Sequence, residues 1–501
     1  MSIRRNIVAG YVGQSYTALI GILLVPLYVQ YMGVEAYGLV GFFTMLLGWF
    51  MLLDMGLTPT IGREAARYNG GATDALALRQ LLRGFEGIFI VVGVAGAAAL
   101  AATAGTIAGH WLKVQQLDLA EVQRSIELMA MIIALRWLCG LYRAAISGFE
   151  RIVWLNAFNV AIATLRFVVV IPFLIHVGST PSYFFTYQLA VAVLEAVVLV
   201  SKTYRLLPAV DVAGWIRWQW APIRSVMRFA LSAAFTSVVW VVVTQSDKLI
   251  LSGLIPLTDY AYFTLAVLMA NGVALLSSPI TGAILPQLTR LYAQGDIVGL
   301  NRLYRNATQL MMVIILPIVL VLAFFPTQVL TAWTGKAEVA ANAAPILMLY
   351  AVGNGVLALA AFPYFLQVAH GELRLHLIGN VLFVLLFVPL LLLAVTRFGM
   401  VGAGYAWIIA NLLPFVAWLP IVHHRYFKGQ HLDWLLKDIA AIVVLPTTCA
   451  ALLLHAMQWP SSQSALAVEL LVVYAGLTAL AAGSAAAVRN RLGARARPGI
   501  A

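Results

Sequence analysis

Three arginines lie deep inside long apolar segments, where a charged side chain is a functional hypothesis by default. Arg136 and Arg143 stand seven residues apart in the apolar segment 126–147, and Arg166 lies in the segment 153–175. A seven-residue spacing places two side chains on one face of a helix. Arg136 comes about 10 residues into its segment, or about 15 Å along a helix, near the middle of a bilayer. Because a guanidinium binds phosphate through paired hydrogen bonds, these arginines predict an anion site.

Carboxylates in the same kind of segment allow two other interpretations. Glu195 lies in the segment 183–204, Asp247 and Lys248 lie together in 229–254, and Asp54 closes the segment 37–57. They could form internal ion pairs: Arg136 or Arg166 with Glu195, Asp247 with Lys248, and Asp54 with Arg63. The three arginines, however, have essentially one acid near the midplane, Glu195. Alternatively, Asp54, Glu195 or Asp247 could carry a proton or Na⁺ that is coupled to transport, since a carboxylate taken out of water binds a proton more readily.

Uncharged polar residues extend the predicted site. Asn159 precedes Arg166 by seven residues, and Thr236, Trp240, Thr244 and Asp247 form a polar stripe along one helix. We expect a cationic cleft formed by Arg136, Arg143, Arg166 and Lys248 and lined by Gln14, Asn159, Thr236 and Thr244.

Motifs for several other chemistries are absent from the sequence. It has no Gly-x-x-x-x-Gly-Lys-Ser/Thr loop, no His-Glu-x-x-His and no Cys-x-x-Cys. Cys139 and Cys449 both fall in apolar segments, and we expect them to be core residues. His423 and His424 adjoin in a basic loop and are expected to be solvated. We therefore expect no metal and no cofactor apart from a coupling H⁺ or Na⁺.

The elements that must position these residues are membrane-spanning helices. Of the 501 residues, 62% are hydrophobic and 10% charged, against about 25% charged residues in soluble domains. About 20 apolar residues cross a bilayer, and such segments recur along the whole chain. The sequence predicts an all-α membrane protein of about fourteen helices: 7–29, 37–57, 84–107, 126–147, 153–175, 183–204, 229–254, 260–280, 307–330, 343–368, 375–395, 401–422, 439–457 and 465–487.

The basic residues predict the orientation of these helices. Of the 31 Lys and Arg, 23 fall in alternate connecting segments and the two terminal segments, and four lie inside helices. Only Lys113, Arg124, Lys336 and Arg397 fall in the intervening loops. Because cytoplasmic loops are rich in Lys and Arg, both termini are predicted to be cytoplasmic. The net charge of +12 is then a topology signal, and a nucleic-acid partner is not expected.

An internal repeat divides the predicted helices. Three patterns recur at separations of 221 to 227 residues: Pro59-x-x-x-Arg63 with Pro286-x-x-x-Arg290, Ala36-Tyr37 with Ala261-Tyr262, and Glu150 to Asn159 with Glu372 to Asn380. Since each half has an even number of helices, the repeat is parallel about an axis along the membrane normal.

The repeat predicts five regions of the chain. These are a first lobe (1–205), an amphipathic cytoplasmic connector (206–228), a second lobe (229–425), two additional helices (426–488) and a basic cytoplasmic tail (489–501).

Several short motifs lie in and next to the predicted helices: Arg5-Asn-Ile-Val-Ala-Gly10, Val25-Pro-Leu-Tyr28, Gly33-Val-Glu-Ala-Tyr-Gly38, Leu53-Asp-Met-Gly-Leu57, Arg63-Glu-Ala-Ala-Arg67 and Gln245-Ser-Asp-Lys-Leu-Ile-Leu251. Together they resemble the bacterial polysaccharide transporters of the Wzx flippase type, in the multidrug/oligosaccharidyl-lipid/polysaccharide superfamily. The resemblance implies two six-helix lobes in a V, as in the multidrug exporters of the superfamily, and alternating access.

The resemblance also implies a substrate: an undecaprenyl-diphosphate-linked oligosaccharide moved from the inner to the outer leaflet of the bacterial cytoplasmic membrane, for O-antigen or exopolysaccharide synthesis. Arg136, Arg143, Arg166 and Lys248 would meet the diphosphate. Membrane lipids, a polysaccharide polymerase and glycosyltransferases would be the partners. A multidrug/cation antiporter of the same fold and a lipid II flippase stay open as alternatives. A membrane glycosyltransferase or ligase is disfavoured, because the longest outside loop, 109–124, is too short to build an active site.

Overall fold

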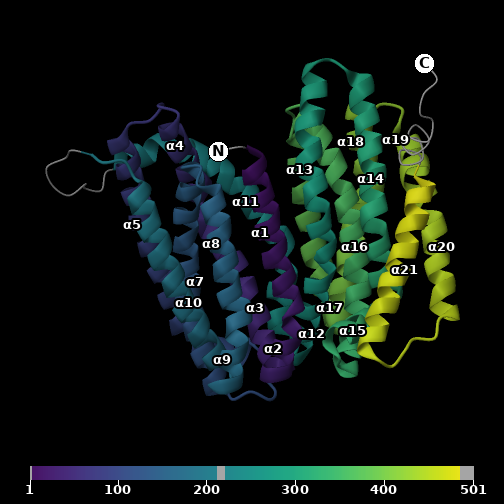
Figure 1. Cartoon of the computed structure of the whole chain (residues 1–501), viewed down its shortest axis with the longest axis horizontal. Helices are drawn as coiled ribbons and strands as arrows, with labels where there is room; N and C mark the ends of the chain where they lie inside the picture. The colour runs from purple at the N-terminus through teal and green to yellow at the C-terminus, as the bar shows by residue number, and fades with distance from the viewer. Residues whose placement is uncertain (1–2, 211–219, 486–501) are drawn as a thin grey trace. The chain divides into compact units, whose positions relative to one another are not determined.

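The computed structural model describes residues 3–210 and 220–485 of the chain (Figure 1). Within these ranges the chain is helical, and the only β contact is an isolated bridge between Lys113 and Pro256. Part of the predicted connector, residues 211–219, and the whole predicted basic tail lie outside the described residues.

The chain divides by contact into two compact units, Met1–Ala261 and Tyr262–Ala501. The helices of the first unit lie side by side and are α1 (Ile3–Leu23), α2 (Val25–Met32), α3 (Val34–Phe50), η1 (Met51–Asp54), α4 (Leu57–Asn69), α5 (Ala75–Ala102), α6 (Ala104–Thr106), η2 (Ile107–Trp111), α7 (Leu119–Gly148), α8 (Ile152–Thr164), η3 (Leu165–Val169), α9 (Val170–His176), α10 (Pro181–Leu206) and α11 (Trp220–Leu254). Helix α12 (Leu257–Ala270) continues from the first unit into the second.

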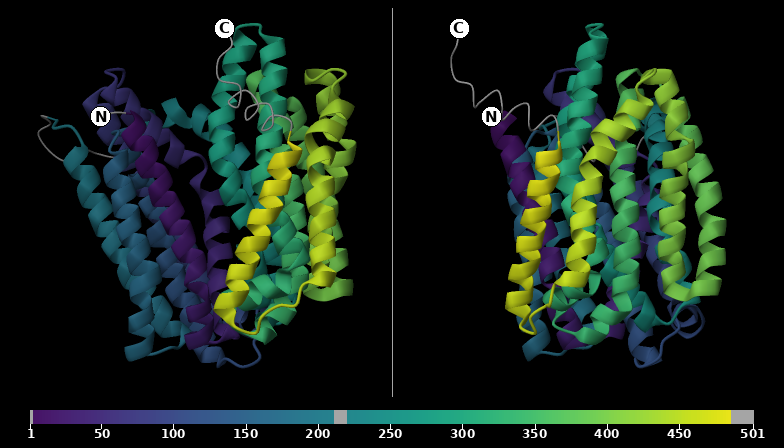
Figure 2. Two further views of the ribbon diagram at one scale, coloured as in Figure 1. Left: turned by 45° about the vertical axis from the view of Figure 1, so that its right-hand side comes forward. Right: turned by 90° about the vertical axis from the view of Figure 1, so that its right-hand side faces the viewer.

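The second unit holds the remaining helices: α13 (Gly272–Ala293), α14 (Ile297–Phe324), α15 (Pro326–Thr334), α16 (Ala337–Ala369), α17 (Arg374–Ala417), α18 (Leu419–Tyr426), α19 (His431–Asp433), η4 (Trp434–Ala440), α20 (Ala441–Ala456) and α21 (Gln463–Ser484). The last two, yellow-green and yellow in Figure 2, pack against each other and against α14.

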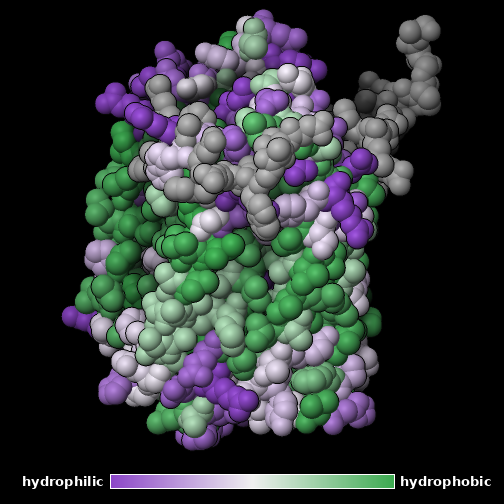
Figure 3. Space-filling model, turned by 90° about the vertical axis from the view of Figure 1, so that its left-hand side faces the viewer, coloured by the Kyte–Doolittle hydropathy of each residue, from purple (hydrophilic) through white to green (hydrophobic). Residues whose placement is uncertain are grey.

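The fourteen predicted helices all have helical counterparts. Within residues 3–210 and 220–485, twelve helical segments are long and apolar enough to cross a membrane. The longest, residues 374–426, contains two of the predicted helices. Gly399 (φ 58°, ψ −143°) separates them with a backbone conformation that residues other than glycine rarely adopt. Helix α11, with 35 residues, also has the length to cross a bilayer. In Figure 3 a broad hydrophobic band separates hydrophilic residues at the two ends of the molecular face.

Helix α11 lies with the first unit, whereas the sequence places it at the start of the second lobe. It packs against α3, α4 and α5. At this contact a Cβ at Gly48 of α3 would lie 2.8 Å from the side-chain amide carbon of Gln245, so a larger residue there would displace the Gln245 side chain. The lobe boundary at residue 229 therefore differs from the contact boundary at Ala261.

Corresponding helix ends in the two halves of the chain have the same hydrogen bonds. After α4, the N–H groups of Gly71 and Ala72 donate to the carbonyls of residues 68 and 67; after α13, those of Gly295 and Asp296 donate to the carbonyls of residues 292 and 291. The pairs stand 224 residues apart in the chain. The ends of α7 and α16 repeat this pattern at an offset of 221, with Glu150 and Gly371 at positive φ. These shared C-terminal caps agree with the predicted repeat.

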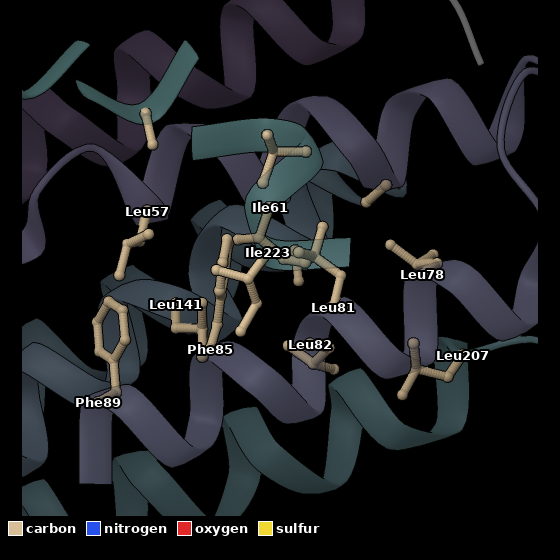
Figure 4. Packing of buried hydrophobic residues seen from close by; sticks show 14 of the residues in the cluster. Leu57, Ile61, Leu78, Leu81, Leu82, Phe85, Phe89, Leu141, Leu207 and Ile223 are labelled. Carbon is tan, nitrogen blue, oxygen red and sulfur yellow. The ribbon is translucent and has the colours of Figure 1, made fainter. Parts of the chain in front are cut away.

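A buried apolar cluster fixes one end of α7 in the first unit (Figure 4). Leu57 and Ile61 of α4, Phe85 of α5, Leu141 of α7 and Ile223 of α11 belong to it. Among membrane helices such contacts act through close packing rather than removal from water. The cluster thus holds four helices together and sets the position of the helix that carries Arg136 and Arg143.

Candidate anion-binding site

Three neighbouring helical segments of the first unit each present two polar residues seven positions apart. Helix α7 carries Arg136 and Arg143, α10 carries Gln188 and Glu195, and the continuous run of α8 and η3 carries Asn159 and Arg166. Helix α7 packs along α10 and against α8, and η3 contacts α10 (Figure 1). Each pair occupies one helix face, and hydrogen bonds connect the six residues. We refer to them as the arginine cluster.

Glu195 is the acidic centre of the arginine cluster. One carboxylate oxygen accepts a hydrogen bond from Nη2 of Arg143, and the other accepts one from Nη2 of Arg166. The side chain of Glu195 is only 2% exposed, whereas those of Arg143 and Arg166 are 27% and 20% exposed. Arg143 also donates to the side-chain oxygen of Asn159. The predicted Arg166–Glu195 pair is therefore present, and Arg143 shares the same acid.

Arg136 has neutral partners instead of the predicted Glu195. Its Nη2 donates to Oε1 of Gln188 at 2.8 Å, and its guanidinium carbon lies 5.2 Å from the ring centre of Phe43. The Nε atoms of Arg136 and Arg166 are buried and have no hydrogen-bond partner among the described residues. Buried donors without a partner are costly, so both arginines retain the capacity to bind an acceptor.

A π turn places Arg166 in the arginine cluster. Residues Leu165–Val169 form η3, and three side chains bind carbonyls of this turn. Tyr187 Oη donates to the carbonyl of Leu165 at 2.9 Å, Gln188 Nε2 to that of Arg166 at 2.9 Å, and Tyr28 Oη to that of Phe167 at 2.7 Å. Single π turns interrupt helices frequently at functional sites. Gln188 thus contacts two of the three arginines.

The charges of the arginine cluster do not balance. Three guanidinium groups face one carboxylate and two side-chain amides, which leaves an excess of two positive charges. In surroundings of low dielectric constant such an excess attracts an anion strongly. Guanidinium groups match the oxygens of phosphate in geometry as well as in charge.

The other predicted site residues have contacts elsewhere. Lys248 Nζ lies 3.0 Å from Asp247 Oδ1, as predicted, and donates to the carbonyl of Thr244 at 2.7 Å. The hydroxyl of Thr244 donates to the carbonyl of Trp240. Lys248 therefore contacts its own helix, α11, rather than the arginine cluster.

Asp54 and Gln14 also lie apart from the contacts of the arginine cluster. Asp54 accepts hydrogen bonds from the backbone N–H and the hydroxyl of Thr58, at the start of α4, while Arg63 lies 3.7 Å from Glu64. Gln14 is exposed on α1. The side chain of Thr236 is outside the described residues.

Gln188, Tyr187 and Phe43 are members of the site that the sequence analysis missed. Gln188 precedes Glu195 by the same seven residues that separate the other pairs, and this signal could have identified it. Phe43 and Tyr187 had no comparable signal, because aromatic residues are frequent in membrane helices.

The prediction for His423 is wrong, although His424 is exposed as expected. His423 is fully buried: its Nε2 lies 2.8 Å from the hydroxyl of Tyr304, and its Nδ1 lies 2.8 Å from Nδ1 of His431. The basic loop predicted around it is instead helix α18, whose buried face packs on α16. Adjacent residues on a helix point in different directions, so one histidine can be buried while the next is exposed to solvent.

A second buried polar group attaches the C-terminal helices to α14. Asp438 of η4 is fully buried and accepts hydrogen bonds from Arg305 Nε at 2.6 Å and Gln309 Nε2 at 2.6 Å. Trp434 Nε1 donates to the hydroxyl of Thr308 at 3.0 Å. The segment that leads into α20 is therefore bound to α14 by specific hydrogen bonds.

The chain resembles known proteins over most of its length. The model of a family described as "Polysaccharide biosynthesis protein" matches residues 3–292. A curated relative, the "Putative O-antigen transporter" of Shigella flexneri, is 20% identical over 420 residues, which cover 82% of this chain and 96% of the relative.

Solved structures of similar fold include two transporter types. A lipid II flippase MurJ in an inward closed conformation has a TM-score of 0.72 at 12% identity, over 95% of this chain and 98% of that one. An inward-facing transporter of the multidrug resistance MATE family, in the MOP superfamily, has a TM-score of 0.68 at 15% identity, over 82% and 94%. The chain therefore has the fold of the MOP superfamily and is a multi-pass membrane protein.

Proposed function

The chain belongs to the polysaccharide biosynthesis protein family, and from this premise we propose that it is a flippase for undecaprenyl-diphosphate-linked oligosaccharide. It moves this substrate from the inner to the outer leaflet of the bacterial cytoplasmic membrane, for the synthesis of O-antigen or another surface polysaccharide. The family and the MOP fold support the transport role. The substrate is the finer part of the proposal and rests on the arginine cluster.

The observation that carries the substrate assignment is the excess of two positive charges in the arginine cluster. A diphosphate esterified at both ends carries two negative charges, which match this excess. The buried Nε donors of Arg136 and Arg166 offer hydrogen bonds to its oxygens. Transferring such a charged group through hydrocarbon unaided would cost many kcal/mol, so a protein that binds it within the membrane removes most of the barrier.

The same charge argues against a multidrug or cation antiporter, although the fold is shared. A cationic drug would be repelled by the arginine cluster rather than bound. A lipid II flippase, which also handles a diphosphate, is the stronger alternative because the MurJ fold is similar. The O-antigen transporter relative and the family model favour the polysaccharide substrate. The same family favours transport over a glycosyltransferase or ligase activity.

Transport would proceed by alternating access, with the polyprenyl tail staying in the lipid. Asp54, Glu195 and Asp247 are candidate carriers of a coupling H⁺ or Na⁺. We expect glycosyltransferases to supply the substrate and a polymerase to consume the product, and we place both termini in the cytoplasm. Neighbouring genes for such enzymes would support the pathway.

The test is translocation by the purified protein in vesicles. Labelled undecaprenyl-diphosphate oligosaccharide is placed in both leaflets, and a membrane-impermeant glycosidase reports how fast the protected fraction becomes accessible. We expect Arg136→Ala and Arg166→Ala each to abolish translocation while leaving expression and insertion intact. The matched control is Arg205→Ala, since Arg205 is exposed on the same helix as Glu195.

Wild-type rates in both arginine variants would remove the diphosphate site from the proposal. Lipid II in the same vesicles separates the two flippase alternatives. Equal or faster translocation of lipid II would favour the peptidoglycan substrate.

A further inference from the structure

Glu195 occupies the position where an anionic ligand would gain most from the arginines. Its two oxygens accept hydrogen bonds from Nη2 of Arg143 and Nη2 of Arg166. The carboxylate is more buried than the two guanidinium groups, since it is 2% exposed while they are 27% and 20% exposed. An arriving anion would therefore reach the guanidinium groups first and share them with Glu195.

We propose that Glu195 is a built-in competitor, which weakens anion binding at the arginine cluster so that the transported group can leave. The inference rests on the proposed function and assigns a role to Glu195, the one acidic residue of the arginine cluster. With three arginines and no acid, a dianion would meet a charge of three; with Glu195 ionised, it meets two. A transport site must bind its cargo strongly enough to admit it and weakly enough to release it.

The competing interpretation is that Glu195 only neutralises arginines for insertion into the membrane. The two interpretations predict opposite effects of removing the charge. If Glu195 is a competitor, its neutralisation strengthens anion binding and slows turnover. If it is only a structural counter-charge, its neutralisation disturbs the arginines and weakens binding or leaves it unchanged.

The same geometry bears on coupling. A proton on Glu195 would remove its charge and strengthen anion binding, so proton and anion would be bound together rather than exchanged. Proton exchange against the substrate requires the opposite linkage. Asp54 and Asp247, which contact Thr58 and Lys248, do not share this constraint.

The experiment measures binding of inorganic pyrophosphate to the full-length protein in detergent, by calorimetry, for the wild type and Glu195→Gln. We expect Glu195→Gln to bind pyrophosphate about tenfold or more tightly, since a unit charge a few ångströms from the ligand is removed at low dielectric constant. We expect its translocation rate in vesicles to fall below that of the wild type.

Glu86→Gln is the matched control. Glu86 is another buried carboxylate of the first unit, but its partners are the hydroxyls of Tyr142 and Tyr204 and the guanidinium of Arg83, outside the arginine cluster. Its neutralisation should leave pyrophosphate affinity unchanged. A comparable gain in affinity in this variant would overturn the proposal, because the effect would then be a general one of lost negative charge.

Glu195→Asp keeps the test open if Glu195→Gln does not fold. Its carboxylate is one methylene shorter, so it withdraws from the arginines, and we expect a smaller gain in affinity. Affinity equal to or below that of the wild type in the folded variants overturns the inference while the proposed function stands. Absence of pyrophosphate binding in the wild type and all Glu195 variants would instead remove the proposed anion site itself.

Discussion

Replacing Asp438 by alanine should lower the melting temperature of the second unit far more than replacing the nearby Asp433 by alanine. Asp438 is fully buried and accepts hydrogen bonds from Arg305 and Gln309, so its removal takes this acceptor from the buried amide of Gln309 and from the guanidinium of Arg305, which is 27% exposed. Breaking a buried charge pair from one side costs about 3 to 5 kcal/mol. For a unit of 240 residues (262–501), each kcal/mol shifts the melting temperature by about 2 to 4 °C. We therefore expect a decrease of about 6 to 20 °C.

Asp433 provides the control on the same segment. It lies 2.9 Å from Lys437, but both side chains are about half exposed or more, and exposed pairs contribute about 0 to 1 kcal/mol. Thermal unfolding of Asp438→Ala and Asp433→Ala in one detergent gives the comparison. Similar shifts for the two variants would show that the buried hydrogen bonds do not anchor the C-terminal helices, and that reasoning from burial fails here.

Two further predictions concern single contacts. Gln188→Leu keeps the side-chain volume but removes the hydrogen bonds to Arg136 and to the carbonyl of Arg166, so translocation should fall about tenfold with normal yield of folded protein; an unchanged rate would exclude a positioning role. The hydrogen bond from Tyr426 and the charge of Arg425 hold the pKa of Glu372 below its ordinary value. This contact therefore stabilises the protein above the ordinary pKa of the carboxyl and is lost as the pH falls through the lowered one. The melting-temperature difference between wild type and Glu372→Gln should accordingly be present at pH 7 and vanish in acid.

The number of helices and the charged residues of the site could be predicted from the sequence for physical reasons. Apolar segments of bilayer length recur along the chain, and the structure has a helix for each. Arg143, Arg166 and Glu195 could be associated because charges inside a bilayer must find partners. Seven-residue spacing supplied the shared faces.

The details that the sequence did not reveal depend on packing between distant segments. Arg136 could not be assigned to Gln188 rather than Glu195, since both acceptors lie on one face of α10. The burial of His423 depends on Tyr304, 119 residues away. The contact of Gly48 in α3 with the side chain of Gln245 in α11 is visible only when both helices are placed.

The π turn at residues 165–169 makes the site sensitive to chain length as well as to residue type. A π turn has i→i+5 hydrogen bonds and so accommodates one residue more than an α turn. Deleting one residue between Asn159 and Arg166 would rotate the arginine by about 100° around the helix and turn it away from Glu195. A one-residue deletion in this segment would therefore abolish the anion site even though every residue of the arginine cluster is retained.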